Sequence, residues 1–141
     1  FVEALRTAIP PDGGSVVVWN KSFEVARNKE LAAMSPQHAD FLLDLNNRVY
    51  DLMEIFQKQD YAHPAFKGSY SIKNVLPVLA PHLSYEGLPI HHGMLASIHW
   101  HKLATGDLTE AERLQVMDNL RRYCGLDTLA MVEVWKVVGG V

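Results

Sequence analysis

The first third of the chain combines helical apolar spacing with one continuous apolar run. Residues 1–9 carry apolar side chains at positions 1, 2, 5 and 9, which predicts a short amphipathic helix. Residues 15–19 are mostly β-branched and show no alternation, which is typical of a strand covered on both faces. After a turn at 20–22, residues 23–34 have the pattern of a second helix. This order of elements predicts a parallel α/β layer.

The middle of the chain is predicted to be helical and interrupted by loops. Ser35-Pro36 opens another helix with apolar residues at helical spacing. The pattern over residues 49–56 fits either the end of this helix or a short second strand. Two further helices are expected at 71–79 and 93–103, separated by loops that carry proline and glycine.

A long helix is expected to end the chain. Thr109 and Glu112 have the spacing of a capping box, and the helix should continue to about Val138, with Gly125 as a candidate break. In total, the sequence predicts one or two strands and about six helices, which is too little sheet for a complete α/β domain. The sequence therefore predicts a single-domain fragment over residues 1–141, the C-terminal part of a larger, mostly helical α/β domain.

The composition is that of an ordinary globular protein. Hydrophobic residues make up 48% of the chain and charged residues 21%. The formal charge of −3 gives no overall attraction to nucleic acid, although bound cations would invert the field around a carboxylate cluster. The single Cys124 excludes an internal disulfide and is expected to be a buried small hydrophobe.

Targeting signals and membrane spans are not expected. The longest apolar run, residues 16–19, is far shorter than the ~20 residues that span a bilayer. We therefore expect no membrane partner and take the cytoplasm as the default compartment. Because the chain begins at Phe1 rather than at Met, we expect that it was cut from a longer protein.

Two acidic tetrads stand near the ends of the chain. Asn20 precedes Glu24 by four residues just after the apolar run, and Tyr123 precedes Asp127 by the same spacing. On a helix this spacing aligns both side chains on one face. Each carboxylate also has a structural explanation. Glu24 would face the dipole of a helix start, and Asp127 would cap a new helix after Gly125.

The two tetrads resemble the second and third motifs of the DEDD exonucleases, in the variant whose last motif begins with tyrosine. Segments 66–77, 83–85 and 123–132 also resemble one uncharacterised bacterial family of the domain-of-unknown-function type, assigned to the RNase H-like superfamily. The resemblance covers essentially the whole chain. It implies an incomplete RNase H-like fold, whose first motif, an Asp-x-Glu pair on the opening strand, would lie before Phe1.

The resemblance implies metal-dependent hydrolysis of phosphodiesters by a 3′–5′ exonuclease in the intact protein. Glu24 and Asp127 would be ligands of a two-metal Mg²⁺ or Mn²⁺ site, and Tyr123 would orient or help to deprotonate the attacking water. Asn20 and Asp51 would support them, Asp51 as a structural carboxylate or one that orients a neighbour. An ordinary surface aspartate explains Asp51 equally well. The expected substrate is single-stranded DNA or RNA. The isolated fragment should be inactive or nearly so, with its metal site empty, because the N-terminal segment with the other carboxylates is missing.

Other side chains allow two interpretations each. Lys67, Lys73 and Arg122 could contact phosphate, but solvated helix faces explain them equally well. The histidines within residues 91–101 have poor spacing for a zinc site. Trp100 is expected to be a core or half-buried packing residue.

A non-catalytic module is the alternative to an enzyme. Glu24 stands where the family normally has Asp, and this departure together with the acidic balance favours a degenerate nuclease fold that binds nucleic acid or protein. A third interpretation, a self-contained helical interaction domain, predicts no buried strand at residues 15–19. If that strand has lost its neighbours, its open edge should pair with a second copy of the chain to form a homodimer.

Overall fold

The computed structural model describes residues 1–9, 13–106 and 108–139. The chain divides into two units, Phe1–Ala62 and His63–Val141, which we call the first unit and the second unit. Each unit contains fully buried apolar side chains, such as Leu42 in the first and Leu76 in the second.

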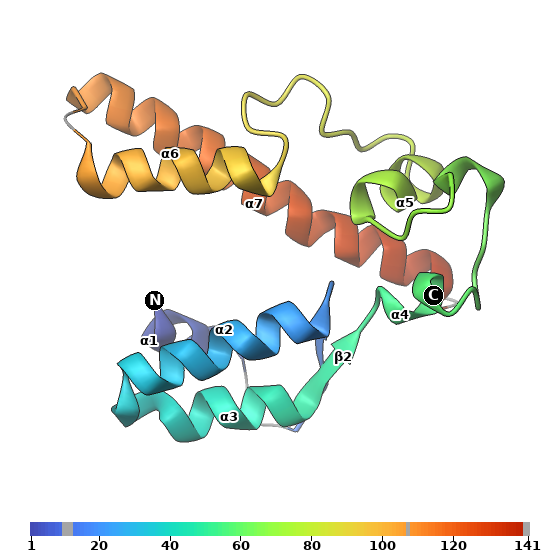
Figure 1. The fold of residues 1–141 in the computed structure, drawn as a ribbon, viewed down its shortest axis with the longest axis horizontal. Coiled ribbons are helices and arrows are strands. Elements are labelled where there is room, and N and C mark those ends of the chain that lie inside the picture. The colour runs from blue at the N-terminus through green and yellow to red at the C-terminus, as the bar shows by residue number, and fades with distance from the viewer. Residues whose placement is uncertain (10–12, 107, 140–141) are drawn as a thin grey trace. The chain divides into compact units, whose positions relative to one another are not determined.

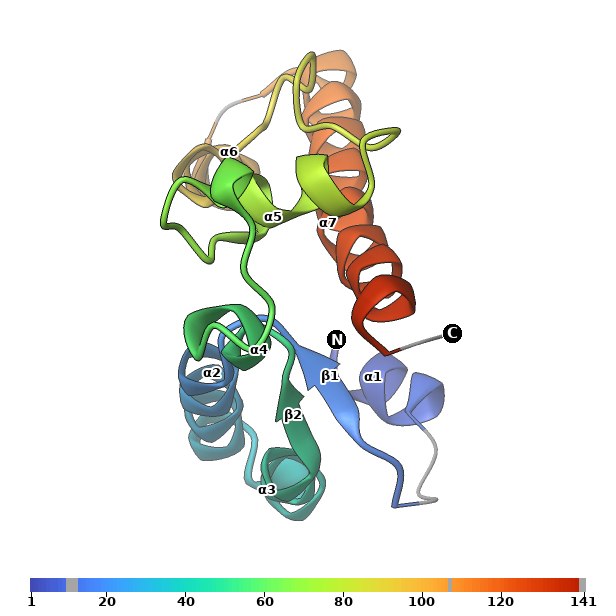
Figure 2. The same ribbon diagram turned by 90° about the vertical axis from the view of Figure 1, so that its right-hand side faces the viewer.

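The first unit places two short strands among helices (Figure 1). Strand β1 pairs in parallel with β2, with Val16 opposite Val49 and Val18 opposite Asp51, and Figure 2 shows the two strands side by side. Because both strands run in the same direction, their carboxyl ends lie at the same edge of the sheet. The elements of this unit are α1 Val2–Ala8, β1 Val16–Val18, α2 Lys21–Met34, the 3₁₀ turn η1 Pro36–His38, α3 Ala39–Arg48, β2 Val49–Asp51 and α4 Glu54–Gln57.

The strands confirm part of the sequence prediction and correct another part. The predicted strand is present, and the ambiguous segment 49–56 begins as β2. The side chains of β1 are half-buried, however, so the prediction of a strand covered on both faces is wrong. Among the described residues the sheet has two strands, which leaves β1 only one neighbour. Pairing of a second copy at the open edge stays a prediction.

Three helices share the core of the first unit. Val2 of α1, Ala32 of α2 and Leu42 of α3 form one buried cluster. Leu42 is fully buried, and burial of a leucine side chain contributes about 1.5–3 kcal/mol to folding. Figure 1 shows α2 and α3 lying along each other, which positions the start of α2 next to the end of β2.

The second unit is built on one long helix. Figure 1 shows α6 beside the first part of α7 and α5 beside its later part. Its fully buried side chains come from α5, from the following loop and from α7, as Val75, Ile90 and Val134 show. The elements are the 3₁₀ turn η2 Pro64–Phe66, α5 Ile72–Leu79, α6 Gly93–Thr105 and α7 Glu110–Val138.

The long helix α7 begins at the predicted capping box. The Thr109 hydroxyl accepts a hydrogen bond from the Glu112 backbone N–H at 3.3 Å, and the Glu112 carboxylate accepts one from the Thr109 N–H at 2.8 Å. The helix then continues without a break through Gly125. The suggested break is therefore wrong, and so is the interpretation of Asp127 as the cap of a new helix. Four residues apart inside one helix, Tyr123 and Asp127 share a face.

The fold is mostly helical with two parallel strands, which agrees with the predicted α/β class. None of the helices that the structure describes is long and apolar enough to cross a membrane.

Candidate functional site

Asp127 of α7 accepts a hydrogen bond from a tyrosine that is distant in the sequence but lies in the same unit. The Tyr85 hydroxyl donates a hydrogen bond to Asp127 Oδ1 at 2.6 Å across 42 residues of sequence. The ring centroids of Tyr85 and Tyr123 lie 6.2 Å apart, and each tyrosine is only 8% exposed. The predicted pair Tyr123 and Asp127 is therefore part of a three-residue arrangement.

Lys73 of α5 adds a positive charge to this arrangement. Its ammonium group lies 5.4 Å from the ring centroid of Tyr85 and 5.6 Å from that of Tyr123. It also donates a hydrogen bond to the backbone carbonyl of His91 at 2.7 Å. Cation–π contacts of this kind contribute about 0.5–2 kcal/mol each. We call Lys73, Tyr85, Tyr123 and Asp127 the tyrosine cluster.

Burial and the neighbouring carboxylate keep both tyrosines of the cluster protonated. Burial, followed by the hydrogen bond to Asp127 and its negative charge, raises the pKa of Tyr85. Burial, followed by the negative charge of Asp127, raises the pKa of Tyr123. Both hydroxyls are therefore neutral near pH 7, where each can donate one hydrogen bond.

Asp51, at the carboxyl end of β2, joins the two strands of the first unit to the elements that follow them. Its Oδ1 accepts hydrogen bonds from the backbone N–H groups of Asn20 at 3.0 Å and Met53 at 3.1 Å, and its Oδ2 accepts one from Lys21 at 2.7 Å. The side chain is 9% exposed. Both carboxylate oxygens are thus engaged by backbone donors, the arrangement of a structural carboxylate.

Asn20 starts α2 immediately after β1. Its backbone is left-handed, with φ of 75°, a conformation that asparagine tolerates better than most residues. Its side-chain oxygen accepts a hydrogen bond from the Phe23 N–H at 3.3 Å, which caps the helix. Glu24 follows in the first turn and is half-buried, and this burial raises the pKa of its carboxyl group.

The structure brings some predicted site residues together within each unit. Asn20 and Asp51 meet at the carboxyl ends of the strands, and Tyr123 and Asp127 meet on α7. Glu24 belongs to the first unit and Asp127 to the second, so the convergence of these two carboxylates stays a prediction.

The described residues do not form a metal site by themselves. Among them, no group of three or more His, Cys, Asp or Glu side chains is placed to hold a metal ion. Asp127 is the one carboxylate in the tyrosine cluster, and the oxygens of Asp51 already accept three backbone hydrogen bonds.

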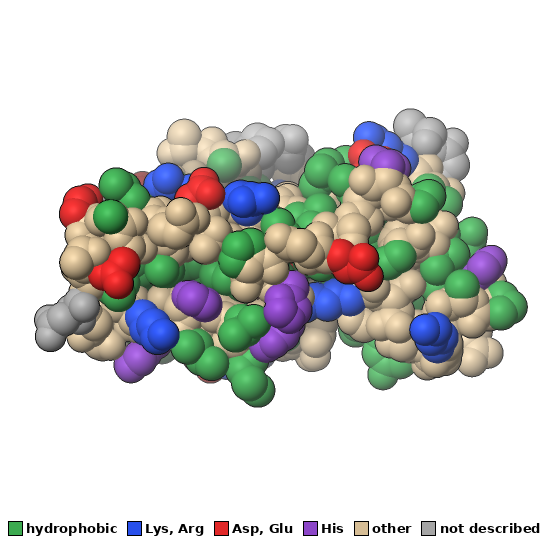
Figure 3. Space-filling view, turned by 90° about the horizontal axis from the view of Figure 1, so that it is seen from above, with side chains coloured by type: hydrophobic (Ala, Val, Ile, Leu, Met, Phe, Trp, Pro, Cys, Tyr) green, Lys and Arg blue, Asp and Glu red, His purple; other side chains and the backbone are tan. Residues whose placement is uncertain are grey.

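The predicted phosphate contacts differ in their surroundings. Lys67 and Arg122 are exposed, Lys67 at the end of η2 and Arg122 on α7. Lys73 instead packs within the tyrosine cluster. On the face shown in Figure 3, acidic and basic side chains are interspersed, so this face presents no single strongly basic patch. Contacts of these three residues with nucleic acid stay predictions.

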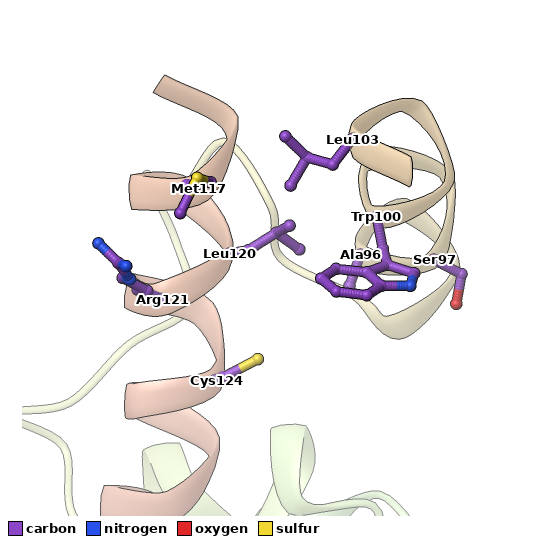
Figure 4. Close-up of a pocket in the computed structure, with 8 residues that line it drawn as sticks. All are labelled: Ala96, Ser97, Trp100, Leu103, Met117, Leu120, Arg121 and Cys124. Atoms are coloured by element: carbon purple, nitrogen blue, oxygen red, sulfur yellow. The ribbon is translucent and has the colours of Figure 1, made fainter. Parts of the chain in front are cut away.

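A groove of about 490 Å³ runs between α6 and α7 (Figure 4). Trp100 is 66% exposed and Cys124 is exposed, so the predictions of a packed Trp100 and a buried Cys124 are wrong. Because α6 packs mainly on α7, its side chains on other faces stay accessible, and none of its 13 residues is buried. The residues that line the groove are Ala96, Ser97, Trp100, Leu103, Met117, Leu120, Arg121 and Cys124.

Sequence reasoning missed Tyr85 as a site residue. Its segment, 83–85, contributed to the family resemblance, but its spacing to Asp127 carries no helical or strand periodicity. The available signal was a tyrosine in a loop, because a buried tyrosine hydroxyl needs a hydrogen-bond partner. Only the fold identifies that partner as Asp127.

Comparisons with known proteins agree with the uncharacterised bacterial family expected from the sequence. Residues 1–71 of the 141 match the sequence profile of the family described as Domain of unknown function (DUF2779). The chain is similar to the uncharacterized protein UU173 of Ureaplasma parvum serovar 3, with 32% identity over 136 residues that cover 85% of the chain and 20% of the relative. It is 30% identical to the uncharacterized protein MG366 homolog of Mycoplasma pneumoniae, over 87% of the chain and 20% of that protein.

The uncharacterized protein MG366 of Mycoplasma genitalium is 28% identical, again over 85% of the chain and 20% of the relative. The chain thus spans about a fifth of the length of these curated relatives. No solved structure matches the chain.

Proposed function

The chain belongs to the family described as Domain of unknown function (DUF2779), and we propose that it is part of an RNase H-like exonuclease domain. The proposed domain is of the DEDD type with a tyrosine in its last motif. It hydrolyses phosphodiesters from the 3′ end of single-stranded DNA or RNA in the intact protein. The observation that carries the proposal is the position of Tyr123 and Asp127 on one face of an uninterrupted helix, with Asp127 fixed by the 2.6 Å hydrogen bond from Tyr85.

The strand ends of the first unit support the same proposal. Ligands of open α/β sheets bind outside the carboxyl ends of the strands. Asn20 and Glu24 follow the end of β1, and Asp51 is the last residue of β2. This arrangement matches the position that the resemblance implies for the second motif.

Tyr123 acts in this proposal through its neutral hydroxyl. The hydroxyl is neutral near pH 7 in the chain alone, and in this proposal it orients an attacking water by hydrogen bonding. Asp127 supplies a carboxylate whose orientation is set by Tyr85. Of the two roles that the sequence left open for Tyr123, orientation is the one we propose.

Two Mg²⁺ or Mn²⁺ ions belong to the proposal for the intact domain. Glu24 and Asp127 would be ligands, and the remaining carboxylates would come from the Asp-x-Glu motif expected before Phe1. Bound metal ions of this type activate water and stabilise the leaving oxygen. Exposed Lys67 and Arg122 are the proposed contacts for the phosphates of the substrate.

A cleavage assay on the full-length protein tests this function. We expect stepwise shortening of 5′-labelled single-stranded DNA or RNA in Mn²⁺, and a rate reduced at least about 100-fold by Asp127→Asn. Asp118→Asn is the matched control, because Asp118 is an exposed aspartate on the same helix. An intact protein that cleaves neither nucleic acid, or one in which both variants cleave equally well, would contradict the proposal.

A non-catalytic nuclease-fold module is the second candidate. The observation that favours it is Glu24, which is half-buried and stands where the resembled motif normally has an aspartate. This candidate predicts binding of single-stranded nucleic acid or protein without cleavage. Fluorescence anisotropy with and without Mn²⁺, measured beside the cleavage assay, distinguishes the two.

A further inference from the structure

We propose that Tyr85 is a positioning residue that holds the carboxylate of Asp127 in one orientation. The inference rests on the proposed function, because it assigns Tyr85 to the same site. The Tyr85 hydroxyl lies 2.6 Å from Asp127 Oδ1, a length typical of a hydrogen bond from a hydroxyl to a charged carboxylate. Such bonds are about twice as strong as those between neutral groups.

The position of Tyr85 is itself fixed by several contacts. Its ring is 8% exposed and packs against Tyr123, which lies one helical turn before Asp127 on α7. The Lys73 ammonium lies over both tyrosine rings, and its hydrogen bond to the His91 carbonyl links α5 to the far end of the same loop. Contacts from α5, the loop and α7 therefore fix the ring of the tyrosine that bonds to Asp127.

The hydrogen bond restricts a side chain that would otherwise sample several rotamers. Asp127 lies inside α7, where its carboxylate is not needed to cap a helix end. The bond from Tyr85 selects one orientation and uses one of the two carboxylate oxygens. The Tyr123 hydroxyl also hydrogen-bonds to the Asp127 carboxylate, so both tyrosines of the cluster contact it.

Two variants separate positioning from packing. Tyr85→Phe keeps the ring and removes only the hydroxyl. Tyr70→Phe makes the same chemical change at a tyrosine that is 44% exposed in the same unit, and it serves as the matched control.

The first readout uses the 141-residue chain and needs no enzymatic activity. With tyrosine carrying ¹³C at Cζ, NMR in an equal mixture of H₂O and D₂O reports the exchange of each hydroxyl proton. We expect the Tyr85 signal to show slow exchange, at least about tenfold slower than that of Tyr70, because its proton is bonded and buried. Asp127→Ala should remove most of this difference. Equal exchange rates for Tyr85 in the unchanged chain and in Asp127→Ala would overturn the proposal.

The second readout uses the full-length protein and single-stranded substrate. Loss of a group that orients a ligand side chain typically costs 10–100-fold in activity. We expect Tyr85→Phe to lower kcat by about that factor with KM changed less than about threefold, and Tyr70→Phe to leave both unchanged. Unchanged kcat in Tyr85→Phe, with an inactive Asp127→Asn, would overturn the role of Tyr85 and leave the proposed function intact. Full cleavage by Asp127→Asn would instead overturn the proposed function. It would also overturn the positioning role of Tyr85, even if slow exchange of the Tyr85 proton shows that the hydrogen bond exists.

Discussion

Asp51, the last residue of β2, accepts a 2.7 Å hydrogen bond from the backbone N–H of Lys21, the first residue of α2. The start of a helix leaves backbone N–H groups without partners inside the helix. Here a carboxylate from the neighbouring strand supplies the missing acceptor. The hydrogen bonds of Asp51 therefore fix both the strand pair and the direction in which α2 leaves it.

Removing this carboxylate should destabilise the first unit. Asp51→Ala leaves the N–H groups of Asn20, Lys21 and Met53 without their acceptor, and we expect a loss of about 2–4 kcal/mol in the free energy of unfolding. Asp44→Ala is the control, since it breaks one pair with Arg48, four residues further on the same helix, and the Asp44 side chain is 58% exposed; pairs at this spacing contribute about 0.3–0.5 kcal/mol. Urea denaturation followed by circular dichroism measures both. Equal losses in the two variants would contradict the assigned role.

Gly125 should be replaceable with a gain in stability. It lies in the interior of α7, and a Cβ atom there would meet no other atom within 4 Å. Glycine inside a helix costs about 0.5–1 kcal/mol relative to alanine, so Gly125→Ala should stabilise the chain by that amount. Gly106→Ala should do the opposite, because its Cβ would lie 2.6 Å from the Lys102 carbonyl oxygen. Thermal unfolding tests the sign of both changes.

The capping box should make stability depend on pH. Hydrogen bonds from Thr109 lower the pKa of the Glu112 carboxyl below its ordinary value of 4.5. A carboxyl whose pKa is lower in the folded state contributes stability above its unfolded pKa, and this contribution disappears as the pH falls through the folded pKa. We therefore expect Glu112→Gln to destabilise the chain at pH 7 and much less below the ordinary pKa.

Two further variants serve as comparisons for the pH dependence of Glu112→Gln. Thr109→Ala should cost about 1 kcal/mol at neutral pH, as for other helix caps. Glu110→Gln lies in the same first turn outside the capping box and should show a smaller pH dependence than Glu112→Gln. Denaturation at a series of pH values compares all three. A penalty for Glu112→Gln that stays constant from pH 7 to pH 3 would contradict the capping role.

Trp100 should contribute little to folding despite its size. It is 66% exposed at the rim of the groove, and exposed substitutions usually change stability by less than about 0.5 kcal/mol. Leu76→Ala, at a fully buried position of the same unit, should cost about 2–5 kcal/mol. Chemical denaturation of the two variants provides the comparison. A loss above 2 kcal/mol for Trp100→Ala would show that its indole is packed in solution.

Local sequence patterns predicted the structure correctly where contacts between neighbouring residues determine it. The capping box of Thr109 and Glu112 is set by hydrogen bonds over three residues, and the structure has it. The same holds for the position of β1, whose β-branched run favours an extended chain. The turn predicted at 20–22 is shorter in the structure, because α2 begins at Lys21. The tetrad of Tyr123 and Asp127 could be placed on one face because helical spacing alone decides it.

Tertiary contacts explain what the sequence could not predict. Gly125 favours a helix break by its intrinsic preference, yet packing of α5 and α6 against α7 holds the helix together. Trp100 lines the groove between α6 and α7 and stays exposed because the two helices leave this groove open, which no local pattern reveals. Tyr85 and Asp127 are 42 residues apart, and only the fold brings them within hydrogen-bonding distance.

The 29 residues of α7 form one uninterrupted helical rod about 43 Å long at 1.5 Å per residue. The groove and the pair of Tyr123 and Asp127 lie on this same rod. A rigid-body tilt or roll of α7 would therefore carry the phenol and the carboxylate together and leave their mutual geometry unchanged. Such a motion would instead strain the contact with Tyr85, the partner that comes from outside the rod.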